Sequence, residues 1–224
     1  MNKIEQYFLI LFSCIFLLFS CNTLSEQDIS DTYRIGILMP ESGNFAQYAE
    51  SFMKGLECFY QTNNELFNKN HPKIELIYYD NQSDNEIAIK GCNYLINKEK
   101  VDFIIGPLTS KISNSVIPIG EKAGVPILPL WATADGLTAQ SPAAFRIVYS
   151  NSQTGYLLAK FSIENLHSRK AAIIYDPDAY FHVESAEGFK EGYDELSSGD
   201  VQMFSITSAH KDIVKLLTEY QPDV

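Results

Sequence analysis

The sequence predicts an α/β protein built from two doubly wound, Rossmann-like lobes. Short apolar runs rich in β-branched residues alternate with segments whose apolar residues recur every three or four positions. This alternation is typical of βαβ units with parallel strands. With 46% hydrophobic and 20% charged residues, the 224-residue chain has the composition of a globular protein. Two alternating runs meet near Phe145, which predicts a first lobe over residues 33–144 and a second over residues 145–224.

The predicted strands end at proline, glycine or polar residues, and the predicted helices carry an apolar stripe. The predicted strands are residues 33–39, 73–79, 101–105, 125–130, 171–175 and 201–206. The predicted helices are residues 45–67, 85–98, 111–122, 153–166, 183–196 and 211–220. Residues 222–224 have the character of a further strand start. Because a complete doubly wound sheet has roughly five or six strands, we expect the second lobe to be truncated at Val224.

The stretch VDFIIGPLTS, residues 101–110, is central to the prediction. Its apolar run suits a strand buried on both faces, Gly106-Pro107 ends the strand, and Thr109 and Ser110 open a helix. A helix that starts where a parallel strand ends presents unpaired N–H groups, which favour a carboxylate or phosphate. The alternative is that Ser110 only caps its own helix.

The first 21 residues have the features of an export signal and not of the fold. Lys3 is followed by an apolar run over residues 7–20, which as a helix would span roughly 21 Å, too short for a bilayer. Leu18-Phe19-Ser20-Cys21 resembles a bacterial lipobox, although Phe19 replaces the usual small residue. LFSC also occurs at residues 11–14, but too little apolar sequence precedes it. We therefore expect lipidation at Cys21 and a tether over residues 22–32.

Composition and motifs exclude several kinds of function. A net charge of −11 argues against nucleic acid or an anionic membrane surface as a partner. The four histidines are scattered, so no metal site is expected. Neither a nucleotide-binding glycine motif nor a nucleophile elbow occurs, and no catalytic constellation is present. We expect no cofactor and no enzymatic activity.

Two further cysteines, Cys58 and Cys92, lie in the first two predicted helices. With the strand order 2-1-3-4-5, right-handed crossovers place these helices on opposite faces of the sheet. Their separation would then far exceed the roughly 7 Å between Cα atoms that a disulfide tolerates. Both are expected to be free thiols.

Several segments in the right order resemble the type I periplasmic binding proteins, in particular the family that binds branched-chain amino acids (Leu/Ile/Val) for ABC transporters. They are RIGILMPESGNFAQYAESFMKG, the strand end at Asp80, VDFIIGPLTS, the region of Thr133 after VPILP, FRIVYSNSQTG, and AAIIYDPDAY with EGFKEG. The resemblance runs from about Tyr33 to Val224. It implies that two α/β lobes close over an amino acid or a similar small molecule and dock on an ABC permease.

The resemblance also implies a set of ligand-binding residues. Ser110 would hold the ligand carboxylate, and Thr133, with the backbone of Trp131, would hold the carboxylate and the ammonium. Tyr48 and Tyr180 would pack against the ligand, although each could equally be an ordinary half-buried tyrosine. Trp131 stands where the family usually has a small residue, which implies a pocket of a different shape. The alternative is that the Trp131 side chain only packs within the lobe.

The expected function is therefore an extracytoplasmic, lipid-anchored binding protein that captures a small carboxylate for an ABC importer by hinge closure. The alternative is a ligand-sensing or envelope-enzyme-activating lipoprotein on the same fold. Phe181-His182 replace a common glycine of the family, and the acidic residue that would pair with the ligand ammonium falls beyond Val224. For a chain ending there, weak solute binding is expected.

Overall fold

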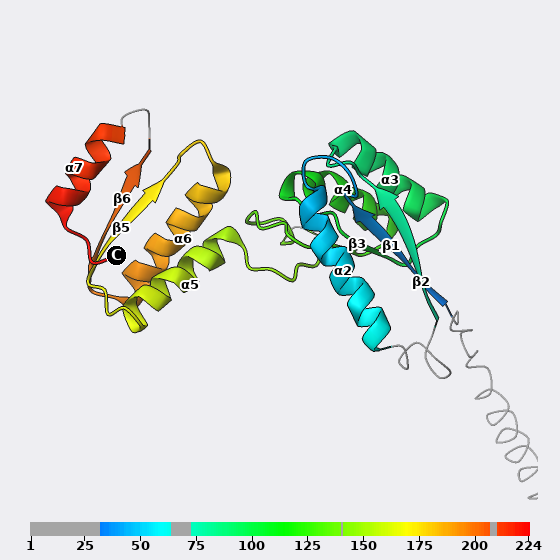
Figure 1. Ribbon diagram of the computed structural model, residues 1–224, viewed down its shortest axis with the longest axis horizontal. Helices are drawn as coiled ribbons and strands as arrows, with labels where there is room; N and C mark the ends of the chain where they lie inside the picture. Colours follow the sequence, from blue (N-terminus) through cyan, green and yellow to red (C-terminus); the bar gives the residue numbers. More distant parts are fainter. Residues whose placement is uncertain (1–31, 64–72, 140, 207–209) are drawn as a thin grey trace, which may run out of the picture.

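The structure, a computed structural model, describes residues 32–63, 73–139, 141–206 and 210–224, without the side chains of 210–212 (Figure 1). The predicted signal, the lipidation site at Cys21 and residues 22–31 of the predicted tether lie outside the described residues, whereas Thr32, the last predicted tether residue, is the first residue of β1. The helices and strands are β1 (Thr32–Met39), α2 (Ala46–Thr62), β2 (Lys73–Asp80), α3 (Asn85–Asn97), β3 (Phe103–Ile105), α4 (Ser110–Ala123), β4 (Ile127–Leu128), α5 (Asn151–Glu164), β5 (Lys170–Tyr175), α6 (Tyr180–Leu196), β6 (Asp200–Ser205) and α7 (His210–Tyr220).

The strands form two parallel sheets, which confirms the predicted α/β fold. The first sheet has the order β2-β1-β3-β4, and the second pairs β5 with β6. We call the first sheet with α2, α3 and α4 the first lobe, and the second sheet with α5, α6 and α7 the second lobe. Figure 1 shows the two lobes joined by the segment that leads into α5.

Helices cover both faces of the first sheet, because successive residues of β1 point to opposite sides. Ile37 and Met39 pack with Ala49 of α2 on one face. Leu38 packs with residues of α3 and α4 on the other face, including Cys92. These three β1 side chains are at most 2% exposed.

The cysteine prediction is confirmed. Cys58 is exposed on α2 and Cys92 is buried on α3, and both thiols are free. The two helices lie on opposite faces of the first sheet, as the crossover rule requires (Figure 1).

Several element bounds differ from the prediction; helix α6, for example, starts at Tyr180, three residues earlier than predicted, and β3 starts at Phe103, two residues later. The strand predicted over residues 125–130 is only the two-residue β4, because Pro126 and Pro129 have no N–H to donate to a neighbouring strand. Helix α2 ends at Thr62, and Phe67 lies outside the described residues. Helix α5 starts at Asn151, two residues earlier than predicted.

The last residues of the chain lie beside β5. The Asp223 N–H donates to the Lys170 carbonyl at 2.7 Å, and the Ala172 N–H donates to the Val224 carbonyl at 2.9 Å. The carbonyls of Arg169 and Tyr175 accept instead from β6 and from the residue that follows it. The chain end therefore lies along the edge of β5 opposite β6, as expected for residues 222–224, although no regular strand forms there.

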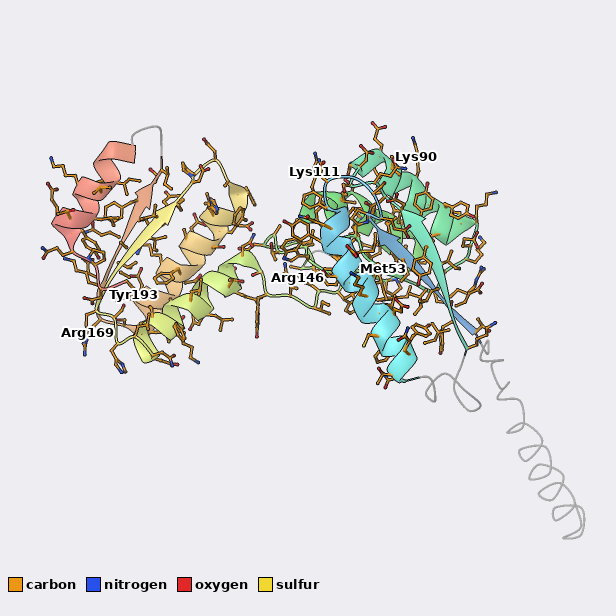
Figure 2. The ribbon with its side chains drawn as sticks, in the orientation of Figure 1. Met53, Lys90, Lys111, Arg146, Arg169 and Tyr193 are labelled. Carbon is orange, nitrogen blue, oxygen red and sulfur yellow. The ribbon has the colours of Figure 1, made fainter. Side chains whose placement is uncertain are left out.

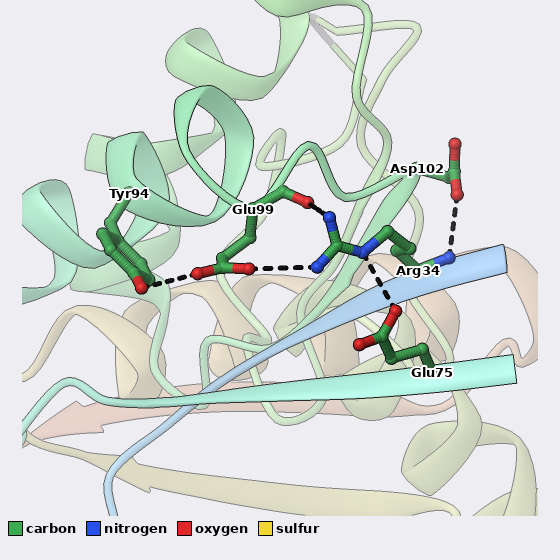
Figure 3. A network of polar contacts seen from close by, with 5 residues as sticks. All are labelled: Arg34, Glu75, Tyr94, Glu99 and Asp102. Carbon is green, nitrogen blue, oxygen red and sulfur yellow. Dashed lines mark hydrogen bonds and ion pairs between the residues drawn. The ribbon is translucent and has the colours of Figure 1, made fainter.

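A polar network joins the amino ends of the strands in the first lobe (Figure 3). The Arg34 guanidinium donates to the Glu75 carboxylate at 3.1 Å, to the Glu99 carboxylate at 3.0 Å and to the Glu99 carbonyl. The Arg34 N–H donates to Asp102, and the Tyr94 hydroxyl donates to Glu99. This network lies at the amino ends of the strands. In open α/β sheets, ligands bind at the opposite side, in the crevice formed by the loops after the carboxyl ends of the strands.

No helix within the described residues is long and apolar enough to cross a membrane.

Candidate functional site

The turn after β3 brings the start of α4 next to the end of β4. Gly106 has a φ of +99°, and a Cβ at this position would lie 2.3 Å from the Leu38 carbonyl oxygen, so only glycine fits. The Gly106 N–H donates to the Leu128 carbonyl at 2.8 Å, and the Leu130 N–H donates to the Pro107 carbonyl at 3.1 Å. The residues after β3 and after β4 therefore meet at the carboxyl edge of the sheet.

Ser110 is the first residue of α4, and its hydroxyl does not cap that helix. The N-cap is Thr109, whose side chain makes no capping hydrogen bond. The Ser110 hydroxyl oxygen instead accepts from the Ala134 N–H at 3.1 Å. Among the described residues no acceptor for the Ser110 hydroxyl proton is found, so this hydroxyl can donate to a ligand. The alternative that Ser110 only caps its own helix is therefore wrong.

The loop over residues 131–135 is held by contacts to its carbonyl oxygens. One Arg146 nitrogen, Nη1, donates to the Ala134 carbonyl at 2.8 Å and to the Ala132 carbonyl at 3.5 Å. The Asn151 N–H donates to the Thr133 carbonyl at 2.9 Å. Figure 2 shows Arg146 on the segment that joins the two lobes. Three successive carbonyl groups of this loop thus already accept hydrogen bonds within the protein.

Trp131, the first residue of this loop, belongs to a group of exposed aromatic rings. The rings of Tyr48 and Trp131 are 5.0 Å apart between centroids and tilted by 46°, and the Phe45 ring lies 6.3 Å from that of Tyr48. Trp131 is 45% exposed and Tyr48 is 41% exposed. The structure therefore brings two of the predicted aromatic residues together as an open wall, next to the loop that contacts Ser110.

Asp80 fixes the loop between β1 and α2, which leads into the helix that carries Tyr48. Its carboxylate accepts from the N–H groups of Glu41, Ser42 and Gln82 and, at 2.7 Å, from the Ser42 hydroxyl. Burial alone would raise the pKa of the Asp80 carboxyl, but the hydrogen bonds from Ser42, Gln82 and Glu41 lower that pKa below its usual value. The loop from β1 to α2 is thus tied to the end of β2.

Side-chain hydrogen bonds of Glu184 and Asp135 add to the contact between the two lobes. The Glu184 carboxylate of α6 accepts from the Asp135 N–H at 3.2 Å and from the Asn151 side-chain amide at 2.7 Å. The Asp135 carboxylate accepts from the Ser152 N–H at 3.2 Å, in the first turn of α5. A carboxylate at a helix start interacts favourably with the helix dipole. These bonds link the Thr133 loop to α5 and α6, so they set how the second lobe meets the first.

The remaining predicted site residues lie apart from this arrangement. Tyr180 is the first residue of α6 and is 75% exposed. Among the described residues, no hydrogen bond or ring contact joins it to Ser110, Trp131 or Tyr48. In the same part of the chain, no three His, Cys, Asp or Glu side chains lie close enough together to hold a metal ion.

The sequence analysis did not single out Arg146, Asn151, Glu184 or Asp135 as site residues. One signal was available for Asn151. Ser150 and Gln153 have the spacing of a capping box, and the structure shows both capping bonds. That motif predicts that α5 starts at Asn151. In the structure the Asn151 N–H contacts the Thr133 carbonyl at the lobe junction.

Comparisons with known proteins identify the family to which the chain is similar. The periplasmic binding protein family matches residues 32–220. The Leu/Ile/Val-binding protein of Escherichia coli K12 is 26% identical over 215 residues, which cover 96% of this chain and 57% of that protein. It is named as a binding protein and not as an enzyme, in agreement with the absence of catalytic motifs.

Solved structures show the same fold. The branched-chain amino acid transporter substrate-binding protein of Streptococcus pneumoniae, in complex with isoleucine, has a TM-score of 0.61 and 26% identity, over 85% of this chain and 54% of that chain. An ABC transporter substrate-binding protein of Desulfitobacterium hafniense, in complex with Leu, has a TM-score of 0.71 and 24% identity, over 85% and 55%. The chain spans about half the length of the relatives it matches. The chain belongs to the periplasmic binding protein family.

Proposed function

We propose that the chain is an extracytoplasmic solute-binding protein that captures an amino acid or a similar small carboxylate for an ABC importer. The observation that carries this proposal is the position of the Ser110 hydroxyl. It lies at the uncapped start of α4 and is held by the Ala134 N–H of the neighbouring loop. Family membership supports the same reading.

A carboxylate is the chemical group that suits this place. The first N–H groups of α4 receive no side-chain cap, and the positive end of a helix dipole favours an anion. The Ser110 hydroxyl adds a donor, and the Thr133 hydroxyl belongs to the adjacent loop. The Streptococcus pneumoniae relative holds isoleucine, whose carboxylate meets the same requirement. Tyr48 and Trp131 would contact the apolar body of the solute.

The proposed mechanism is hinge closure. The lobes are joined by residues 145–150 and by the bonds of Glu184 and Asp135 across the junction. Rotation about the joining segment would bring the second lobe over the solute held by the first, with Tyr180 at the start of α6. The few bonds at the junction are compatible with such a rotation.

The proposed partners follow from the same function. A loaded binding protein delivers its solute to ABC permease subunits, and a lipid chain on Cys21 would keep it at the membrane on the extracytoplasmic side. Labelling cells with a radioactive fatty acid and comparing the natural chain with Cys21→Ser tests the anchor. We expect label on the natural chain alone, and label on both would contradict lipidation at Cys21.

The solute site is tested by calorimetry with a panel of amino acids and small carboxylates. Ser110→Ala should weaken the binding of the best solute by about 1–3 kcal/mol, the usual effect of losing a hydrogen bond to a charged group. Ser115→Ala, in the same helix but past its first turn, is the matched control and should leave affinity unchanged. Equal affinities for the natural chain and the Ser110 variant would remove Ser110 from the site.

A further inference from the structure

Strand β2 forms one border of the first sheet, and the outer side of its backbone is open. Its residues are all in register with β1. The Met39 carbonyl accepts from the Asn81 N–H, so in this alternation the odd-numbered residues turn their N–H and carbonyl groups toward β1. The N–H and carbonyl groups of Ile74, Leu76 and Tyr78 therefore point away from the sheet. Within the described residues these groups have no hydrogen-bond partner.

An apolar hollow accompanies the open border. The side chains of the same three β2 residues line it together with Met53 and Leu56 of α2, and its volume is about 520 Å³. Tyr78 is 47% exposed. At the rim of the hollow, Glu50 and Lys54 form an ion pair with each other at 2.6 Å, so their charges are already balanced. A strand laid along β2 would gain backbone hydrogen bonds and apolar contacts together.

The border lacks the features that usually keep edge strands from pairing with other chains. Natural edge strands are short, are interrupted by proline or a bulge, or carry charges. β2 has eight residues in unbroken register, with neither proline nor glycine. Between Lys73 and Asp80 the sole charged residue is Glu75, whose carboxylate is paired with Arg34 at 3.1 Å. The segment IELIYY therefore combines high β-propensity with little free charge.

A second copy of β2 matches this border by symmetry. A two-fold axis perpendicular to the sheet makes the two strands antiparallel and keeps their apolar faces on one side. With Leu76 opposite the same residue of the second copy, Ile74 lies opposite Tyr78, a favourable pairing of a β-branched with an aromatic side chain. The open backbone groups then form about six hydrogen bonds, two in each of three opposed pairs. A shift by two residues would instead oppose Ile74 to the carboxylate of Asp80.

From this arrangement we infer that two copies of the chain associate through β2 and join their first-lobe sheets into one continuous antiparallel junction. The inference goes beyond the proposed function, because the junction lies at the border opposite β4 and uses none of the solute-site residues. The contact is narrow, so the dimer is a reversible one that forms at high protein concentration.

Sedimentation velocity tests the association on the chain without residues 1–21, whose apolar run could associate by itself. We expect mostly dimer at about 100 µM and mostly monomer at about 1 µM, as for a small interface. Tyr78→Lys places a charge on the border and should weaken dimerisation at least about tenfold. Tyr149→Lys is the matched control, because Tyr149 is 64% exposed on the segment joining the lobes, and it should dimerise like the natural chain. Thermal melts of both variants check folding.

Cysteine cross-linking tests the register. In a Cys58→Ser chain without residues 1–21, the remaining cysteine is the buried Cys92. Directly opposed residues have Cα atoms about 5.5 Å apart, which a disulfide spans, so Leu76→Cys should give a covalent dimer on mild oxidation. Ile74→Cys is the control, because the two copies of residue 74 would lie more than about 13 Å apart, and it should not cross-link.

Each result either supports the β2 junction or overturns it. A chain that stays monomeric at about 100 µM, or that forms species larger than a dimer, would overturn it. A dimer that is unaffected by Tyr78→Lys, or that cross-links as well through Ile74→Cys as through Leu76→Cys, would place the contact elsewhere and also overturn it. Solute binding measured by calorimetry is a separate observable, so failure of the junction leaves the proposed function intact.

Discussion

Replacing Gly188 by alanine should separate two helices that meet at their backbones. Helices α5 and α6 cross where a glycine of each faces the backbone of the other. A Cβ at Gly188 would lie 2.1 Å from the Ser152 carbonyl oxygen, and one at Gly155 would lie 2.0 Å from the Ser185 carbonyl oxygen. Ordinary contact begins near 3.4 Å, so the helices would have to move apart by about 1 Å. Because both sides are backbone, no change of rotamer relieves the clash.

The magnitude follows from two opposing effects. Overpacking costs about 1–3 kcal/mol, and a backbone clash belongs at the upper end of that range. Alanine returns about 1 kcal/mol through its higher helix propensity. We therefore expect Gly188→Ala to lower the free energy of unfolding by about 2 kcal/mol, equivalent to a fall of about 5 °C in melting temperature.

Gly55→Ala is the control for this experiment. Gly55 lies in α2, and a Cβ added there would have no neighbouring atom within 4 Å, so alanine should stabilise the chain by up to about 1 kcal/mol. Trp131, the single tryptophan, reports unfolding of the first lobe by fluorescence, while far-ultraviolet circular dichroism reports the helices of both lobes. A Gly188→Ala chain as stable as the natural one in dichroism melts would refute the close helix contact.

Three further predictions concern acid stability, thiol reactivity and the lobe junction. The hydrogen bonds that lower the pKa of Asp80 stabilise the fold above the unfolded pKa of about 3.9, and this stability is lost as pH falls through the folded pKa. Melts at pH 5 and pH 3 should thus differ less for Asp80→Asn than for the natural chain, and equal differences would contradict this. Burial raises the pKa of the Cys92 thiol to about 12, so in a chain without residues 1–21 a thiol reagent should modify only Cys58 until the protein unfolds. Rapid modification that persists in Cys58→Ser would argue against it. Glu184→Ala removes the bond to Asp135 between the lobes and the bond to Asn151 that positions the start of α5, so it should speed proteolysis of residues 145–150 severalfold, and an unchanged rate would show that the junction is held elsewhere.

Much of the first lobe could be predicted from the sequence, because its signals are local. The apolar runs, the glycine-proline stop at Gly106 and the alternation of strands with helices determine the parallel sheet and the separation of Cys58 from Cys92. The predicted strand over residues 125–130 is longer than β4, because the run is apolar throughout but contains Pro126 and Pro129. A missing N–H limits pairing whatever the apolar content of the run.

The site could be predicted only in part. Ser110 and Trp131 follow strand ends, so their positions at one sheet edge could be anticipated from parallel topology. The contact of Arg146 with the Thr133 loop and that of Glu184 with Asp135 join residues 12 to 49 positions apart. No local pattern specifies such pairs, because they depend on how the second lobe meets the first.

The most direct test of the central claim is nuclear magnetic resonance of the ¹⁵N-labelled chain during titration with small carboxylates, including 3-phenylpropionate and L-leucine. If a solute carboxylate binds at the start of α4, the amide signals of Ser110, Lys111 and Ala134 and the indole signal of Trp131 should shift together and saturate at one solute concentration. The amide of Arg34, at the opposite edge of the sheet, should stay unchanged. Saturating shifts confined to other parts of the chain, or no saturating shift with any carboxylate, would contradict the proposed solute site.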